Sequence, residues 1–85
     1  MIRVNDLEER IREILANVSD DSINAQNINL DENLFEAGFD SIMAIKVIVK
    51  IEELFDIQFD DTELSFENIE SINSMISMIY KKIKH

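Results

Sequence analysis

The stretch Gly38-Phe39-Asp40-Ser41-Ile42 places an aspartate and a serine where a helical pattern of apolar residues begins. If Asp40 caps that helix, the hydroxyl of Ser41 lies in the first turn, points away from the core and can be reached by another protein. The positive end of the helix dipole favours a phosphodiester at this position. Asp-Ser pairs are also common as ordinary helix caps. The pair alone therefore leaves open whether Ser41 is a modification site.

Catalysis by the chain itself finds little support in the sequence. A nucleophilic serine needs a neighbouring base, and the only histidine is His85, the last residue. The lack of cysteine removes thiol nucleophiles, thiolate metal sites and disulfides together. The adjacent carboxylates Asp60 and Asp61 are typical of a solvated turn. We therefore expect a protein that is not an enzyme, and a hydrolase that uses Ser41 is disfavoured by the missing base.

One segment resembles a calcium-binding loop only in part. Asn27, Asn29 and Asp31 alternate as the ligands of an EF-hand do. However, Glu32 stands where that loop needs glycine, and Gly38 stands where it needs a bidentate glutamate. The sequence therefore predicts no metal site.

The composition predicts one small α-helical domain that spans residues 1–85. Hydrophobic residues make up 46% of the chain, but one glycine and no proline are too few for the tight turns of a small sheet protein. The 18 acidic and 8 basic side chains give a net charge of −10, which disfavours nucleic acid and suits basic protein surfaces. No apolar run approaches the ~18 to 20 residues of a membrane span, and residues 1–6 show no signal-peptide pattern. We expect a cytoplasmic monomer that does not bind membranes.

Hydrophobic periodicity predicts three main helices and one short helix, with a long loop between the first and the second. The expected elements are a helix at about residues 5–18, a loop to residue 40, a helix from 40 or 41 to about 55, a short irregular helix near 61–69 and a last helix after residue 71. Asn5 and Ser71 are the expected N-caps of the first and last helices. Glu8 and Arg12 form an expected i,i+4 ion pair.

Apolar residues within the loop are expected to pin it onto the core. They are Ile23, Ile28, Leu30, Leu34 and Phe35, with Phe39 beside them. Residues 31–37 are expected to form a short helical turn capped by Asp31.

The helix over residues 41–55 has more apolar surface than a core stripe requires. Its expected buried face consists of Ala44, Val47, Ile48, Ile51, Leu54 and Phe55. Ile42, Ile45 and Val49 form a second strip, part of which should stay exposed because a small bundle cannot cover all sides of one helix. Exposed apolar strips on small proteins indicate contact with a partner, although plain core packing is the other interpretation of these three residues.

The residues around Ser41 resemble those of acyl and peptidyl carrier proteins. Residues 34–42 read LFEAGFDSI, and the segments Ala44-Ile45 and residues 51–55 (IEELF) follow. In that family the motif L-F-x-x-G-x-D-S-[LI] marks the serine that receives 4′-phosphopantetheine from coenzyme A. The similarity extends over nearly the whole chain, and it implies an all-α, four-helix carrier bundle.

The resemblance also implies a role for each matching residue. Ser41 would carry the phosphopantetheine, Asp40 would cap the helix and contribute to recognition by the transferase, and Gly38 would let the loop turn into the helix. Ile42, Ile45 and Val49 would meet partner enzymes. The acidic residues Glu52, Glu53 and Asp56 would guide weak docking onto basic patches. The implied partners are a phosphopantetheinyl transferase, an enzyme that loads an acyl or aminoacyl group, and downstream synthase or tailoring enzymes.

Two positions depart from the carriers of fatty-acid synthesis, which usually have acidic residues where this chain has Met43 and Lys46. Ala44-Ile45 and the face with Lys46 and Lys50 look more like peptidyl carriers, whereas the strong negative charge resembles acyl carriers. The sequence predicts a discrete carrier in a nonribosomal peptide or polyketide pathway. The alternatives are a fatty-acid-type acyl carrier protein and an acidic helical interaction module that is never modified.

Overall fold

Four α-helices form the protein, as expected from the apolar periodicity. A computed structural model describes residues 4–20 and 23–84, with α1 at Val4–Val18, α2 at Ser41–Phe55, α3 at Phe66–Ile69 and α4 at Ile72–Lys84. The described residues contain no strand, which confirms the all-α prediction of three main helices and one short one. None of these helices has the length and apolar character needed to cross a membrane, as far as the described residues extend.

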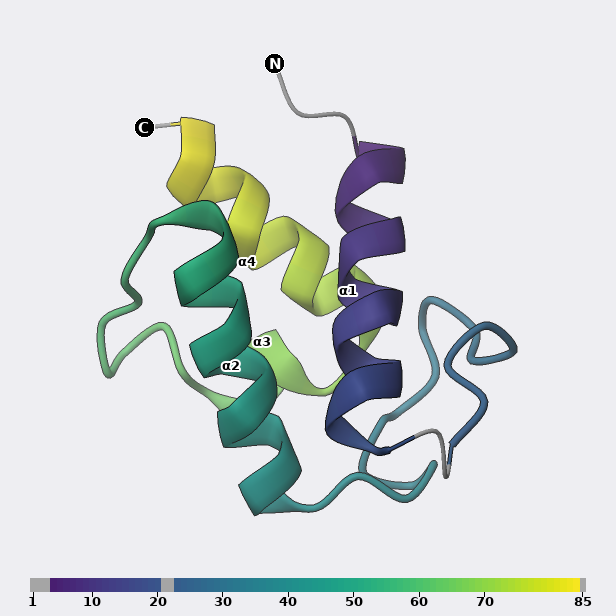
Figure 1. Cartoon of the computed structure of the whole chain (residues 1–85). Helices are drawn as coiled ribbons and strands as arrows, with labels where there is room; N and C mark the ends of the chain where they lie inside the picture. Colours follow the sequence, from purple (N-terminus) through teal and green to yellow (C-terminus); the bar gives the residue numbers. More distant parts are fainter. Residues whose placement is uncertain (1–3, 21–22, 85) are drawn as a thin grey trace.

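The core lies between α1, α2 and α4. α1 packs against both other long helices, and α3 packs against α4. Figure 1 shows α2 running opposite to α1, so that α2 begins beside the end of α1, away from the start of α1 and the end of α4. Each long helix contributes fully or almost fully buried side chains: Leu7, Ile11 and Leu15 of α1, Val47, Ile48 and Ile51 of α2, and Ile72, Met75 and Ile79 of α4. Each such side chain stabilises the fold by about 1.5–3 kcal/mol relative to an exposed one.

Several local predictions differ from the structure. α1 begins at Val4, so Asn5 lies inside the first turn and is not the cap. The short helix covers only Phe66–Ile69, because residues 61–63 form a separate turn in which the Glu63 amide donates to the Asp60 carbonyl at 2.9 Å. Ser71 does cap α4, since its Oγ accepts from the Ser74 amide at 3.1 Å.

Leu54 is 49% exposed, although its position on the helical wheel predicts burial. It lies in the last turn of α2, where it borders an open hollow together with Arg10 and Glu13 of α1. A wheel assumes that a neighbour covers the whole length of a face, and at this level of α2 the neighbour leaves a gap.

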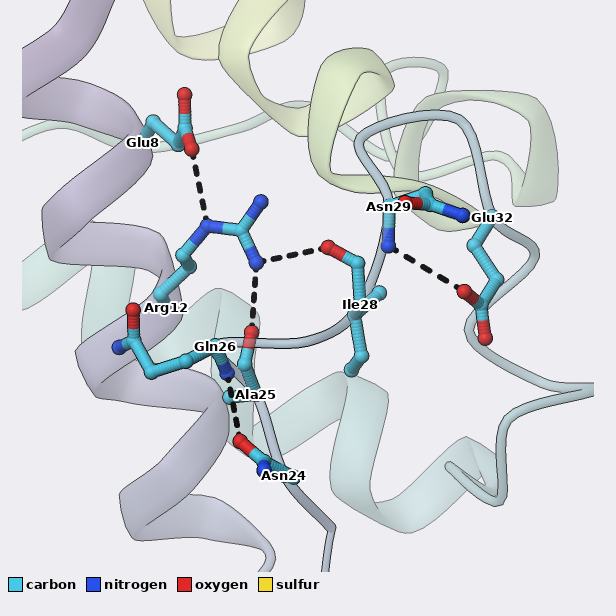
Figure 2. Close-up of polar contacts among 8 residues, drawn as sticks. All are labelled: Glu8, Arg12, Asn24, Ala25, Gln26, Ile28, Asn29 and Glu32. Carbon is cyan, nitrogen blue, oxygen red and sulfur yellow. Dashed lines mark hydrogen bonds and ion pairs between the residues drawn. The ribbon is translucent and has the colours of Figure 1, made fainter.

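The buried side chain of Arg12 joins α1 to the long loop. Its Nη1 donates to the carbonyls of Ala25 at 2.7 Å and Ile28 at 2.8 Å, and its Nε donates to Glu8 Oε2 at 3.0 Å (Figure 2). The contact with Glu8 confirms the expected ion pair, while the two loop contacts were not expected from the sequence. Arg12 is only 9% exposed, so its charge is stabilised by these three acceptors and not by water.

The later part of the loop is held by the junction of α3 and α4. The Asn73 amide donates to the Leu30 carbonyl at 3.0 Å, and the Leu34 amide donates to the Glu70 carbonyl at 2.7 Å. The side chain of Asn73 also donates to Asp31 Oδ1 at 2.7 Å. The loop is therefore fixed through its backbone at both ends, in addition to burying Ile28, Leu34 and Phe39 as three of its apolar anchors.

A second ion pair fastens the segment between α2 and α3 to α4. Glu63 Oε1 accepts from the Asp60 amide and from Lys82 Nζ, each at 2.8 Å. The Asp60 hydrogen bond, followed by the Lys82 ammonium, lowers the pKa of the Glu63 carboxyl from its ordinary value of 4.5. The same contact raises the pKa of Lys82 above its ordinary value of 10.5.

We expect Arg12→Met to lower the free energy of unfolding by about 2–5 kcal/mol, because two buried loop carbonyls lose their donor and Glu8 loses its partner. Urea unfolding followed by circular dichroism measures this change. Arg10→Met is the matched control on the same helix, since Arg10 is exposed and its nearest ion-pair contact, Glu13, lies 3.8 Å away. Equal effects of the two substitutions would show that Arg12 does not hold the loop.

We expect the stability that Glu63 adds to depend on pH in a defined direction. Because its folded pKa is lowered, the contribution is complete above pH 4.5 and is lost as pH falls through the folded value. The difference in unfolding free energy between the natural protein and Glu63→Gln should therefore shrink on acidification, as measured by urea unfolding at a series of pH values. Glu67→Gln is the control for loss of one exposed carboxylate. A difference that stays constant across the acid range would contradict the Glu63 contacts.

Candidate modification site at the start of α2

A single helical turn precedes the site and is capped by Asn33. Asn33 Oδ1 accepts from the amides of Phe35 at 2.9 Å and Glu36 at 3.2 Å, and its carbonyl accepts from the Ala37 amide at 3.1 Å. The expectation of a turn in this region is met, but Asp31 was the wrong cap. The sequence held a usable signal, because Asn33 and Glu36 have the spacing of a capping box.

Gly38 ends this turn with a φ of +118°, a backbone conformation that other residues rarely adopt. A Cβ at this position would lie 3.3 Å from the Cδ1 atom of Ile23, which is the mobile end of a side chain. The next residue, Phe39, is 4% exposed and anchors the chain in the core before α2 begins. The positive φ of Gly38 is the backbone geometry that the expected turn at this position requires.

Asp40 caps α2. Its backbone is extended, and its Oδ1 accepts from the Met43 amide at 2.8 Å, while its carbonyl accepts from the Ala44 amide at 3.0 Å. The carboxylate is thus used to satisfy a free amide of the first helical turn. This contact fixes where α2 starts and makes Ser41 its first residue.

Ser41 is exposed. Its side chain makes no hydrogen bond within the part of the chain that the structure describes, so the hydroxyl is accessible to an enzyme. The first turn of α2 contains no acidic residue, and the positive end of the helix dipole lies at the same place. An accessible hydroxyl at the N-terminus of a helix suits a covalently attached phosphate ester. In contrast, no group of three or more His, Cys, Asp or Glu side chains arranged to hold a metal occurs among residues 4–20 and 23–84.

An apolar strip extends from Ser41 along α2. Ile42 is 66% exposed, Ile45 63% and Val49 44%. The expectation that part of this strip is exposed is confirmed, and the interpretation of these residues as core packing is wrong. Because the described part of the chain leaves much of each of these side chains uncovered, the strip is available to a partner.

The three acidic residues near the end of α2 differ in their surroundings. Glu52 is half-buried, and its Oε2 accepts from the Phe59 amide at 2.9 Å, so it holds the segment between α2 and α3. Glu53 is exposed, as is Asp56, which ends the helix in the left-handed conformation with a φ of 54°. Glu53 and Asp56 are therefore better placed for external contacts than Glu52.

Two aromatic residues link the turn before Ser41 to α3. Phe35 is half-buried and packs edge-on against Phe66 of α3, with ring centroids 5.4 Å apart and an interplanar angle of 72°. Phe66 itself is 66% exposed. The turn before Ser41 is thus attached to α3 as well as to the core.

Fold and site together define the class as a small all-α carrier bundle. Residues 9–79 match the family model described as "Phosphopantetheine attachment site". The chain belongs to this phosphopantetheine-binding family of carrier proteins, which are covalently loaded with 4′-phosphopantetheine and serve as substrates of other enzymes. The family and the cofactor are therefore as predicted.

Named relatives agree with this assignment. The chain is 35% identical over 72 residues to an aminoacyl carrier protein of Agrobacterium fabrum, covering 81% of this chain and 87% of the relative. It is 39% identical over 66 residues to an acyl carrier protein of Phytoplasma mali, covering 75% and 76%. It also matches a chain in the crystal structure of an engineered Bradyrhizobium japonicum glycine:[carrier protein] ligase complexed with carrier protein from Agrobacterium tumefaciens and ATP. That match has a TM-score of 0.81 and 29% identity, and covers 88% of this chain and 97% of the other.

We expect Gly38→Ala to lower the free energy of unfolding by about 1–3 kcal/mol, because alanine is strained at this φ. Thermal or urea unfolding measures the loss. Ile23→Val in the same background is the control, since it removes the Cδ1 atom that a Cβ would approach. If backbone strain is the cause, the second substitution restores little stability. Full restoration would show that crowding, and not the conformation of Gly38, is responsible.

Proposed function

We propose that Ser41 is the residue to which 4′-phosphopantetheine is attached, and that the chain is a discrete carrier in a nonribosomal peptide or polyketide pathway. The observation that carries the proposal is the exposed hydroxyl of Ser41 directly after the capping Asp40. The bound group supplies a terminal thiol on which an acyl or aminoacyl group is held as a thioester. The chain has no cysteine of its own to provide that thiol.

The residues around Ser41 each contribute to its presentation. Asp40 sets the start of α2, and Gly38 turns the chain so that Phe39 is buried while Ser41 faces outward. The helix dipole favours the negative charge of the attached phosphodiester. We assign to Asp40 a further role in recognition by the transferase, because it is the side chain next to the modified hydroxyl.

Two features support an aminoacyl or related cargo. The relative from Agrobacterium fabrum is an aminoacyl carrier protein, and the matched crystal structure contains a glycine:[carrier protein] ligase. Met43 and Lys46 also stand where carriers of fatty-acid synthesis usually have acidic residues. The acyl carrier relative from Phytoplasma mali supports the alternative of a fatty-acid-type carrier.

The proposed partners are a phosphopantetheinyl transferase, a ligase that loads the cargo and the enzymes that use it. We place their contacts on Ile42, Ile45 and Val49, with Glu53 and Asp56 meeting basic side chains at the end of α2. Glu52 belongs to the same acidic group, although its carboxylate already accepts from Phe59. Such exposed charges steer encounter and orientation more than they add affinity.

Intact-mass spectrometry after incubation with coenzyme A and a broad-specificity phosphopantetheinyl transferase tests the proposal. The natural protein should gain one phosphopantetheine, and Ser41→Ala should gain none. Ser65→Ala is the matched control, because Ser65 is also exposed next to a helix start and its side chain caps nothing. A natural protein that stays bare would favour the unmodified interaction module, and modification of Ser41→Ala would overturn the assigned residue.

The modified protein then tests the cargo. We expect it to accept an amino acid in the presence of ATP and a glycine:[carrier protein] ligase from Bradyrhizobium japonicum, seen as a second mass increase that hydroxylamine removes. Loading only by an acyl-activating enzyme would instead support the fatty-acid-type alternative.

A further inference from the structure

The positive charges of this acidic protein are unevenly placed. Lys46 and Lys50 project from α2 on the side that faces α1, and Arg10 projects from α1 nearby, since Lys50 and Arg10 border the same hollow. The net charge is −10, but the part of this face around Lys46 and Lys50, beside the apolar strip of α2, is lined by no acidic side chain, whereas Glu13 and Glu53 lie near Arg10. Carrier function through Ser41 does not by itself require such a patch.

A groove lies between α1 and α2 at this face. It has a volume of about 400 Å³ and is lined by Asn17 and Val18 of α1 and by Ile45, Lys46, Val49 and Lys50 of α2. A second hollow of about 300 Å³ shares Asn17 and Lys50 with it and is also lined by Ile14 and Leu54 and by the charged residues Arg10, Glu13 and Glu53. The first of these hollows is called here the α1–α2 groove; its charged lining residues are Lys46 and Lys50, and no carboxylate lines it.

The two lysines of the groove have no internal partner. Arg12 and Lys82 are each paired with a carboxylate at 3.0 Å or less, and Arg10 has Glu13 at 3.8 Å. Within the described residues no carboxylate lies at ion-pair distance from Lys46 or Lys50, although the chain has 18 acidic side chains. Their charges are thus free to meet carboxylates from outside.

We propose that the α1–α2 groove docks an acidic amphipathic helix of a partner protein. Apolar side chains of that helix lie against Val18, Ile45 and Val49, and its carboxylates pair with Lys46 and Lys50. A groove between two helices accommodates a third helix through such i, i+3, i+4 contacts. The proposal rests on the proposed carrier function for the identity of the partner as an enzyme of the pathway, but the docking contacts themselves do not involve Ser41.

The charge distribution favours this occupant over two others. A second copy of the chain would bring a further net charge of −10 to the interface, and an anionic membrane would face the same repulsion over a wide area. A single helix in the α1–α2 groove lies directly beside Lys46 and Lys50, the charged residues that line it, and salt screens its interaction with carboxylates more than about 8–10 Å away.

Nuclear magnetic resonance titration of the ¹⁵N-labelled full chain tests the proposal with two synthetic helical peptides. They share one leucine face, and one carries glutamate flanks while the other carries lysine flanks. We expect only the glutamate peptide to shift the amides of Asn17, Lys46, Val49 and Lys50. The double substitution Lys46→Glu/Lys50→Glu should weaken its binding about tenfold or more. Lys81→Glu, an exposed lysine of α4 outside the groove, is the matched control and should leave binding unchanged.

Each other outcome would overturn the docking proposal. Equal or tighter binding of the lysine peptide would exclude an acidic partner, and shifts confined to other helices would place the contact elsewhere. Self-association through the groove in sedimentation would assign it to a second copy, and stronger shifts of the same amides with phosphatidylglycerol vesicles would assign it to a membrane. Ser41→Ala should bind the glutamate peptide as the natural protein does, so failure of modification and failure of docking are separate results.

Discussion

The guanidinium of Arg12 determines how the long loop lies on the helices. An irregular segment leaves backbone carbonyls without partners, and a buried carbonyl without a donor is costly. Arg12 supplies donors to two such carbonyls, while Glu8 neutralises a charge that burial would otherwise isolate. The guanidinium, the Glu8 carboxylate and the two loop carbonyls each need the others as hydrogen-bond partners. The contact therefore makes α1 and the loop stabilise each other. The turn that presents Ser41 continues from this loop and is held in its turn by the Leu34 amide, which donates to the Glu70 carbonyl, and by the buried Phe39.

The features of this protein that depend on residues close together in the sequence could be predicted. Apolar spacing locates α1, α2 and α4 because one stripe of each must face the core. Asp40 and Ser71 cap their helices through amides three residues away, so their roles are readable from the chain itself. The candidate site also depends on residues that are close together in the sequence. Its exposed serine, its cap and its glycine with positive φ all lie within residues 38–43.

Features that depend on distant residues were not predictable from spacing. Arg12 meets carbonyls 13 and 16 positions later, and Glu63 meets Lys82 at a separation of 19. In the sequence, each of these residues has only the properties of an exposed charge, and the tertiary fold alone brings the partners together. The exposure of Leu54 also depends on the tertiary fold, because the position of the neighbouring helix decides whether a helical face is covered. The loop could be recognised as a loop, but not the contacts that order it.

The charged side chains of α2 change sign along the helix, from basic to acidic. This order affects the orientation in which a carrier docks onto its enzymes. Lys46 and Lys50 line the α1–α2 groove, whereas Glu53 and Asp56 lie one to two turns further along, toward the end of α2. A partner with carboxylates over the groove and cations over the end of α2 fits in one orientation, and the reversed orientation brings like charges together. Exposed pairs of this kind contribute little affinity, about 1 kcal/mol or less each. Under the proposed function, in which Ser41 carries the cofactor, such contacts suit a carrier that is bound in one orientation and then released to the next enzyme.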